Sequence, residues 1–233
     1  MSKRDICLSK MPNYLTEIPE QWHSRKFEDI TNPVMKPIAD KLLTWNFQNP
    51  VCAGIISPQN GIGKTHLATC VFKKFIYEDI GKEFDRITED YSEDNYGRLG
   101  SWVMGTGRRV FNHFDEPLKP TKYMFLSEKK LALQIQESFN QKTVSQLEIL
   151  ESYTKAEFLV IDDLFSLRAN EFARQNLFYI IDERTDWNGK PTFITSNLSL
   201  PEIADIDTRI ADRIRNSMLF QVYDKIDSFR RNK

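Results

Sequence analysis

The sequence predicts an α/β fold built around a buried parallel β-sheet, and three observations support this. Short apolar runs rich in β-branched residues recur along the chain, which is typical of buried strands. Segments with apolar residues at helical spacing separate these runs, and strands that alternate with helices favour a parallel sheet. The chain has 233 residues and 40% hydrophobic content, which is enough for one well-packed domain.

The expected elements alternate along most of the chain. We expect strands at "VCAGIIS" (51–57), "KYMFLS" (122–127), "FLVIDDLF" (158–165) and "PTFITSN" (191–197), with "LFQV" as a last short strand. Helical spacing is expected in residues 34–48, 63–80, 128–139, 144–155, 170–187 and 207–218.

Two segments depart from this alternation. Residues 1–33 are polar and interrupted by prolines, so we expect an extended N-terminal arm. Residues 81–120 begin acidic and become glycine-rich and basic, and we expect a long insertion or loop there. Its "SWVMGTGRRVF" stretch interleaves aromatic residues with arginines, a pattern that can bind single-stranded nucleic acid. A loop or an arm that docks a protein is the alternative.

Composition narrows the functional class. The net charge is −1, so the overall electrostatic field of the protein does not attract nucleic acid. Any contact with nucleic acid would need a local basic patch. The three cysteines and three histidines are scattered, without the spacing of a disulfide framework or a zinc site. No apolar run is long enough for a signal peptide or a membrane span. We therefore expect a soluble, cytoplasmic protein with no membrane partner.

The stretch "IISPQNGIGKTHLA" comes close to the phosphate-binding pattern G-x-x-x-x-G-K-[ST], with Pro58 in the first glycine position. Gly61 and Gly63 allow backbone N–H groups to face phosphate oxygens. Lys64 supplies a charge for the β- and γ-phosphates, and Thr65 supplies a hydroxyl for Mg²⁺. The helix that follows adds its positive N-terminal dipole. A glycine turn that binds nothing is the alternative, and the strand–loop–helix context disfavours it.

Acidic and amide side chains follow two later strands. Asp162 is expected to hold Mg²⁺ through water, and Asp163 to orient or deprotonate the attacking water. Asn197, just past an apolar strand, is placed to hydrogen-bond that water or the γ-phosphate. Each can instead be an ordinary turn or cap residue. Their position after a phosphate loop favours the catalytic interpretation.

Three arginines are further candidates. Arg209 and Arg213 are four residues apart and share a helix face. They either pair with nearby aspartates or act as arginine fingers on a neighbouring subunit's nucleotide. Arg230, near the end of the sequence, either folds back on the γ-phosphate or belongs to a basic tail.

Together "GIGKTHLA", "FLVIDDLF", "GKPTFITSNLSLPEI", "RIADRIR" and "DSFR" have the order and spacing of the DnaC/DnaI-type helicase loaders. The chain resembles these AAA+ ATPases of the initiator clade, which are related to DnaA and IstB, over about 25–80 and 120–233. The resemblance implies a P-loop NTPase AAA+ core with a five-stranded parallel sheet of order 5-1-4-3-2, flanked by helices, and a minimal or absent lid domain. The core would occupy residues 34–233, with the insertion at about 81–120.

The resemblance also implies residue roles. "FEDI" would lie near the adenine, and the helix pair at about 128–154 would be the initiator-specific insertion, which helps line a channel for single-stranded DNA. Lys129 and Lys130 would then contact DNA phosphates, unless they belong to a solvated helix face. The implied nucleotide-binding stretch is Gly61, Ile62, Gly63, Lys64, Thr65 and His66. Thr65 and Asp162 would hold the metal, and Asp163 and Asn197 (sensor 1) would contact the attacking water. Arg213 would be the arginine finger with Arg209 beside it, and Arg230 would be sensor 2, which also binds the nucleotide.

The function implied is an ATP-binding and ATP-hydrolysing DNA-replication factor. Its cofactors would be ATP and Mg²⁺, with slow hydrolysis coupled to a nucleotide-dependent homo-oligomer. Single-stranded DNA and a replicative helicase would be its partners. One alternative is an IstB-like ATPase helper of transposition that binds duplex DNA. Another is a binding module that uses ATP only as a latch, which Asp163 and Asn197 disfavour.

Overall fold

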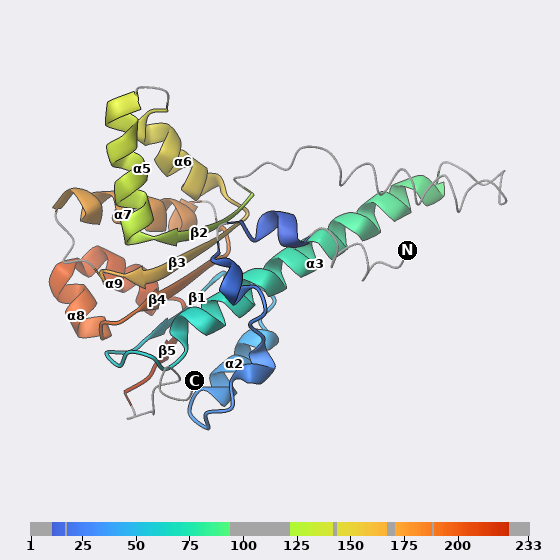
Figure 1. Cartoon of the computed structure of the whole chain (residues 1–233), viewed down its shortest axis with the longest axis horizontal. Coiled ribbons are helices and arrows are strands. Elements are labelled where there is room, and N and C mark those ends of the chain that lie inside the picture. Colours follow the sequence, from blue (N-terminus) through green and yellow to red (C-terminus); the bar gives the residue numbers. More distant parts are fainter. Residues whose placement is uncertain are drawn as a thin grey trace.

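A parallel β-sheet forms the centre of the protein (Figure 1). The structure is a computed structural model that describes residues 11–16, 18–93, 122–141, 144–166, 171–187 and 189–223. The strand order is β2-β3-β4-β1-β5, which is the predicted order 5-1-4-3-2 read from the other edge and confirms the predicted fold class. The strands are β1 (Cys52–Ile56), β2 (Tyr123–Ser127), β3 (Phe158–Leu164), β4 (Thr192–Ser196) and β5 (Met218–Gln221).

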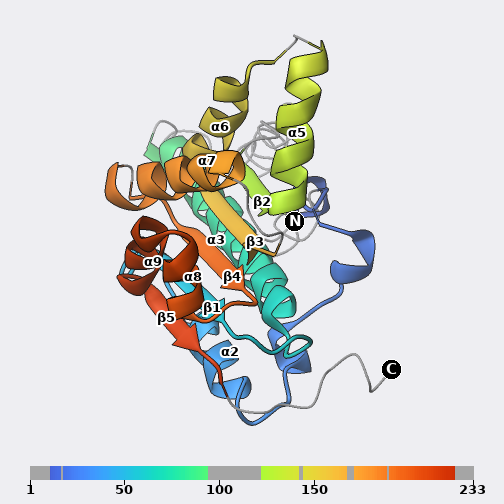
Figure 2. The same cartoon turned by 90° about the vertical axis from the view of Figure 1, so that its left-hand side faces the viewer.

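The sheet separates two hydrophobic cores because successive strand residues point to opposite faces. Val160 and Phe193 belong to one core, and their neighbours Ile161 and Ile194 to the other. The helices α2 (Lys36–Leu43) and α3 (Lys64–Glu93) pack in the first core. The opposite face carries α5 (Glu128–Gln141), α6 (Gln146–Lys155), α7 (Glu171–Asp182), α8 (Leu200–Ile206) and α9 (Thr208–Arg215) (Figure 2).

Local capping fixes where the last two helices begin. The Ser199 side chain accepts from the Glu202 N–H, and the Glu202 carboxylate accepts from the Ser199 N–H, which forms a capping box for α8. Asp207 ends α8 and caps α9 by accepting from the N–H groups of Arg209 and Ile210. These caps set the direction of the helix that carries both candidate finger arginines.

The helix α3 is longer than the sequence pattern suggested. It runs to Glu93, so the first part of the 81–120 segment is helical rather than a loop, and Figure 1 shows it extending beyond the sheet. The acidic stretch 82–93 has no proline or glycine and many good helix formers, which lets the helix continue. The rest of the predicted insertion, residues 94–120, lies outside the described residues.

The N-terminal segment also differs from the extended arm that was expected. Its described part forms short 3₁₀ turns at Met11–Tyr14, Glu20–Trp22 and Phe27–Asp29. The Lys73 ammonium of α3 donates to the His23 carbonyl at 2.8 Å and to the Arg25 carbonyl. The prolines suggested an arm, but the apolar residues between them join the core of α2 and α3: Leu15, Ile18, Phe27 and Ile30 are all buried there.

Candidate nucleotide-binding and catalytic site

The loop between β1 and α3 has the backbone that its glycines predict. Gly61 and Gly63 have φ angles of 79° and 103°, a region that glycine enters without steric cost. Ile62 between them is fully buried and anchors the loop in the core. The helix begins at once, and the Leu67 N–H donates to the Gly63 carbonyl at 2.9 Å. A loop of this shape at a helix N-terminus can present N–H groups to an anion.

The Lys64 side chain is folded back over this loop. Its ammonium donates to the carbonyl oxygens of Ser57 at 3.0 Å and Gln59 at 2.8 Å. Only 7% of the residue is exposed. The positive charge is therefore fixed at the loop rather than free in solvent, which suits a phosphate contact.

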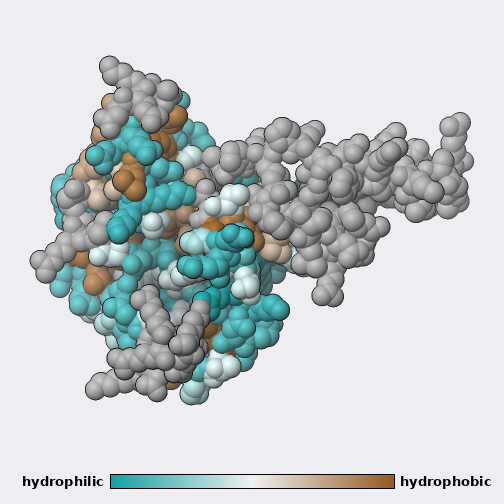
Figure 3. Space-filling model, in the orientation of Figure 1, coloured by the Kyte–Doolittle hydropathy of each residue, from teal (hydrophilic) through white to brown (hydrophobic). Residues whose placement is uncertain are grey.

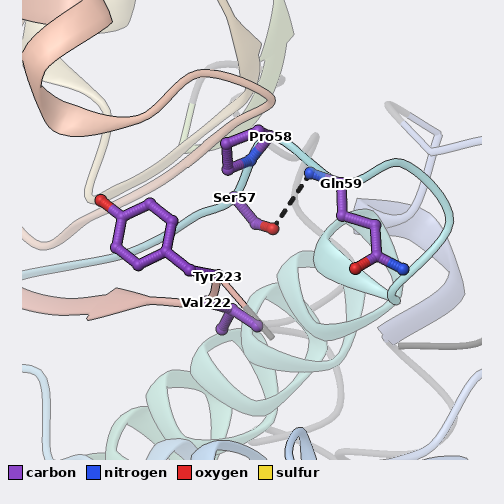
Figure 4. A pocket seen from close by; sticks show the side chains of 5 residues that line it. All are labelled: Ser57, Pro58, Gln59, Val222 and Tyr223. Atoms are coloured by element: carbon purple, nitrogen blue, oxygen red, sulfur yellow. Dashed lines mark hydrogen bonds between the residues drawn. The ribbon is translucent and has the colours of Figure 1, made fainter. Parts of the chain in front are cut away.

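A shallow pocket of about 320 Å³ lies where the loop begins (Figure 4). The Gln59 N–H donates to the Ser57 hydroxyl at 3.2 Å, and Pro58 lies between them in the turn. Val222 and Tyr223 complete the lining, because the Val222 N–H donates to the Ile56 carbonyl at 3.0 Å and aligns the end of β5 with the end of β1. No local pattern marks these two residues, and only the sheet order brings them to the loop.

The two acids of β3 lie in an irregular turn of the strand. The pairing of β3 with β4 shifts register between Ile161 and Leu164, and Asp163 has a φ of 63°. The Thr195 hydroxyl donates to the Asp162 carboxylate at 2.6 Å and accepts from the Asp163 N–H at 2.9 Å. At this bulge the two successive acids depart from the regular alternation of a strand, in which neighbouring side chains point to opposite faces of the sheet.

Asn197 joins the same group. Its side-chain amide donates to the Asp163 carboxylate. The strands β3 and β4 are parallel neighbours, so their carboxyl ends meet at one edge of the sheet, and β1 with its loop lies on the other side of β4. The structure thus brings together Asp162, Asp163 and Asn197, as the sequence predicted. Thr65 of α3 lies near enough to Asp162 to lower its pKa.

Burial raises the pKa of Asp162 to about 6, and the neighbouring Asp163 charge adds to the rise. Hydrogen bonds from Thr195 and Thr65 and the charge of Lys64 act in the opposite direction. A bound divalent cation would favour the ionised form of this carboxylate and would lower its pKa.

The candidate finger arginines are held by aspartates of their own chain. Arg213 donates from Nε and Nη2 to Asp182 of α7, at 3.0 and 2.7 Å. Arg209 pairs with Asp207 at 2.7 Å, and its guanidinium lies 4.0 Å from the centre of the Phe178 ring. The Arg213 side chain is 29% exposed and that of Arg209 is 52% exposed, so both reach the surface over α7 and α9.

The remaining candidates fall in three places. His66 Nε2 donates to the Lys26 carbonyl at 2.8 Å, so the segment that ends in "FEDI" lies beside the start of α3. Burial lowers the pKa of His66, which favours its neutral form. Lys129 is exposed and Lys130 half-buried in the first turn of α5, and Arg230 lies outside the described residues.

Solved structures match this architecture, whereas no protein-family model and no curated protein sequence matches the chain. A replication initiator DnaA bound to AMPPCP and single-stranded DNA gives a TM-score of 0.58 at 15% identity, covering 88% of this chain and 51% of that chain. The DnaC helicase loader gives 0.57 at 19% identity, with 88% and 99% covered. DnaI gives 0.51 at 16% identity, with 89% and 93% covered.

The chain therefore shares its fold with these DnaA, DnaC and DnaI structures. The chain spans about half of the length of the initiator structures it matches. Within this fold, α5 and α6 form two successive helices over the range 128–154, where a helix pair was expected. Apolar side chains reach the surface there, among them Leu133, Phe139 and Leu147 (Figure 3). None of the described helices is long and apolar enough to cross a membrane.

The oxygen donors of this site fit Mg²⁺. The Thr65 side chain and Lys64 both lie near enough to Asp162 to lower its pKa, so a hydroxyl and a carboxylate oxygen are close together at the loop. Magnesium prefers oxygen ligands and takes one or two from the protein, with phosphate and water completing its shell. Thr65 and Asp162 are therefore the residues that would hold the ion.

Sequence reasoning missed two partners of the site. Thr195 contacts both acids, and Asp182 holds Arg213. A threonine inside an apolar strand looks like an ordinary strand residue, and Asp182 is 31 residues from the arginine it binds. The only signal was the polar run "TSN" at the end of an apolar strand, in which the asparagine drew attention and the threonine did not.

Asp162→Asn is expected to stabilise the nucleotide-free protein near neutral pH. The folded pKa, raised from 3.8 to about 6, disfavours the ionised carboxylate by up to about 3 kcal/mol. Stability is therefore highest below the unfolded pKa and falls as pH rises through about 6. Urea unfolding at several pH values should show an advantage of the variant that grows across this window.

The exposed Asp205→Asn is the matched control, because it removes the same charge from the surface of α8. It should shift the free energy of unfolding by less than about 0.5 kcal/mol at any of these pH values. An Asp162→Asn advantage that does not change with pH would contradict the raised pKa.

Proposed function

We propose that the protein is an ATP-binding and ATP-hydrolysing AAA+ replication factor of the loader type, which binds single-stranded DNA and acts on a replicative helicase. One observation carries this proposal: Asp163 is bonded to Asn197, and the neighbouring Asp162 lies near enough to Lys64 and Thr65, at the start of the phosphate-loop helix, for both to lower its pKa. The match to DnaC over most of both chains supports the loader type. The DnaA match supports the nucleotide and the single strand, which its structure contains.

The loop residues would bind the triphosphate. The N–H groups of the Gly61–Gly63 loop and the start of α3 would face the phosphate oxygens, and Lys64 would exchange the loop carbonyls for the β- and γ-phosphates. Bound Mg²⁺ would neutralise phosphate charge and orient the γ-phosphate. The neutral His66 side chain would keep the N-terminal segment against α3, where the resemblance implies the adenine.

Hydrolysis would depend on Asp163 and Asn197. The Asp163 carboxylate would orient the attacking water and accept its proton. Asn197 already donates to this carboxylate and would fix its rotamer. The hydrogen bonds from Asn197 to its carboxylate and from its N–H to Thr195 would keep Asp163 in one orientation, and turnover would be slow until a second subunit completes the site.

Arg213 would complete that site from a neighbouring subunit. Its guanidinium is part-exposed and oriented by Asp182, so it is presented at the surface in a defined direction. An arginine with five N–H donors can keep a carboxylate contact and still address a phosphate. Nucleotide state would thereby control assembly, and Arg209 on the same helix is the second finger candidate.

Arg213→Ala is expected to leave ATP affinity within about threefold of the unmodified protein and to lower hydrolysis by about 100-fold or more, since fingers contribute mainly to the transition state. Steady-state hydrolysis and binding of a fluorescent ATP analogue would measure the two effects. Arg215→Ala is the matched control, because Arg215 lies on the same helix, is 60% exposed and contacts Asp212.

A mixing experiment tests the action between subunits. Lys64→Ala and Arg213→Ala proteins, each inactive alone, should regain ATP hydrolysis when mixed. At some subunit boundaries the intact nucleotide site of an Arg213→Ala subunit meets the intact Arg213 of a Lys64→Ala subunit. Loss of ATP binding in Arg213→Ala, or a mixture that stays inactive while still assembling, would contradict the role in trans.

The assembly itself can be tested by gel filtration with an ATP analogue and single-stranded DNA. The proposal expects a larger species only when both are present. A strict monomer without DNA affinity in either nucleotide state would overturn it. Duplex preference would instead favour the transposition helper.

A further inference from the structure

The end of β4 contacts the acid turn of β3 at three successive residues. Thr195 bonds the turn at Asp162 and Asp163, and the Ser196 hydroxyl donates to the Leu164 carbonyl at 2.8 Å. Asn197 donates to the Asp163 carboxylate. The bulge is therefore held from the neighbouring strand along its whole length.

Thr195 differs from the other two contacts because one oxygen serves both acids. A hydroxyl has one donor and two acceptor lone pairs. Here the donor goes to the Asp162 carboxylate at 2.6 Å, and a lone pair accepts the Asp163 N–H at 2.9 Å. Thr195 is 1% exposed, so water cannot replace either bond without a rearrangement.

The bulge needs such a partner. The register shift between Ile161 and Leu164 interrupts the pairing with β4 at the two acids, and the Asp163 N–H donates to the Thr195 side chain. Asp163 also has a φ of 63°, a conformation that costs free energy for any residue but glycine. A hydroxyl at Thr195 stabilises that conformation and fixes the Asp162 carboxylate at the same time.

We propose that Thr195 is a positioning residue, which sets the Asp162 carboxylate for the metal and the Asp163 carboxylate for the water through a single hydroxyl. The inference rests on the proposed ATPase function and adds a residue to it. Thr195 itself contacts neither nucleotide nor water in this role. Its loss should therefore affect turnover and the use of Mg²⁺ more than the affinity for ATP.

The chain offers a closely matched control. Thr192 begins the same strand, is fully buried, and also uses its hydroxyl twice: it accepts from Arg184 Nε at 2.8 Å and donates to the Lys190 carbonyl at 3.0 Å. Thr192→Val and Thr195→Val remove the same group from the same strand. Only the second touches the acid pair.

The test compares Thr195→Val, Thr195→Ser and Thr192→Val. For each, kcat and KM for ATP are measured, together with the affinity for a non-hydrolysable ATP analogue in Mg²⁺ and in EDTA. Thr195→Val should lower kcat by about 10- to 100-fold, as is usual for a lost partner of a metal ligand, and should reduce the gain in affinity that Mg²⁺ provides. At saturating Mg²⁺, KM should change by less than about threefold, since the contacts of the phosphate loop with the nucleotide remain.

Thr195→Ser should restore kcat to within about threefold, because it keeps the hydroxyl. Thr192→Val should lose thermal stability but keep kcat. Equal losses of kcat in the two valine variants, a normal kcat and Mg²⁺ response in Thr195→Val, or no rescue by serine would overturn the inference. Thr195→Ala serves the same comparison if the valine variant does not fold, which melting curves show.

Different results would overturn the proposed ATPase function and the role of Thr195. An unmodified protein that does not bind the analogue in Mg²⁺ would overturn the proposed function and this inference with it. An unmodified protein that binds and hydrolyses ATP, with Thr195→Val equal to it, would overturn the inference alone.

Discussion

Replacing Lys64 by alanine is expected to abolish ATP binding. The ammonium is 7% exposed and held by the Ser57 and Gln59 carbonyls at the phosphate loop. Removing a buried charge that faces a charged ligand typically costs several kcal/mol, so affinity should fall by about 100-fold or more. Titration with a fluorescent ATP analogue measures this directly.

Lys82→Ala is the control for that experiment. Lys82 is an exposed residue of the same helix, and its replacement changes the net charge equally. It should bind the analogue as the unmodified protein does. Because Lys64 also bonds two loop carbonyls, melting curves should accompany the titration. A folded Lys64→Ala protein with unchanged affinity would contradict the assignment of the loop.

Asp163→Asn is expected to nearly abolish hydrolysis and to leave binding in place. Asparagine has the size of aspartate and tolerates the φ of 63°, so the bulge should persist. The amide cannot accept the proton of the attacking water, and general-base catalysis contributes about 10²- to 10⁴-fold. Single-turnover hydrolysis and analogue binding separate the two effects.

The exposed Asp205→Asn again supplies the control, since it removes an acid of the same charge far along the chain from the turn. Hydrolysis should be unchanged in that protein. If Asp163→Asn hydrolysed ATP at the normal rate, Asp163 would not be the general base. The hydrogen bond from Asn197 to Asp163 would then have no role in catalysis.

Much of the architecture could be predicted because its signals are local. Apolar runs marked the strands of the sheet, and Gly61 and Gly63 marked a loop whose positive φ angles the structure confirms. The acids and Asn197 could be placed together because parallel strands end at one edge. Their individual roles in the reaction stay predictions, and the variants above test them.

What the sequence did not reveal depends on distant packing. The N-terminal prolines suggested an arm, but Phe27 and Ile30 pack in the core of α2 and α3. The acidic start of the predicted insertion continues α3, because it contains no proline or glycine after Gly81 and many good helix formers. Thr195 and Asp182 act through residues of other elements, so their partners could not be predicted from the local sequence.

Fluorescence anisotropy with labelled single-stranded and duplex DNA tests the central claim most directly, each with ADP and with a non-hydrolysable ATP analogue. An ATP-switched loader should bind the single strand with the analogue, release it with ADP, and lose the effect in Lys64→Ala. Affinity that ignores the nucleotide, or that favours duplex, would contradict the account.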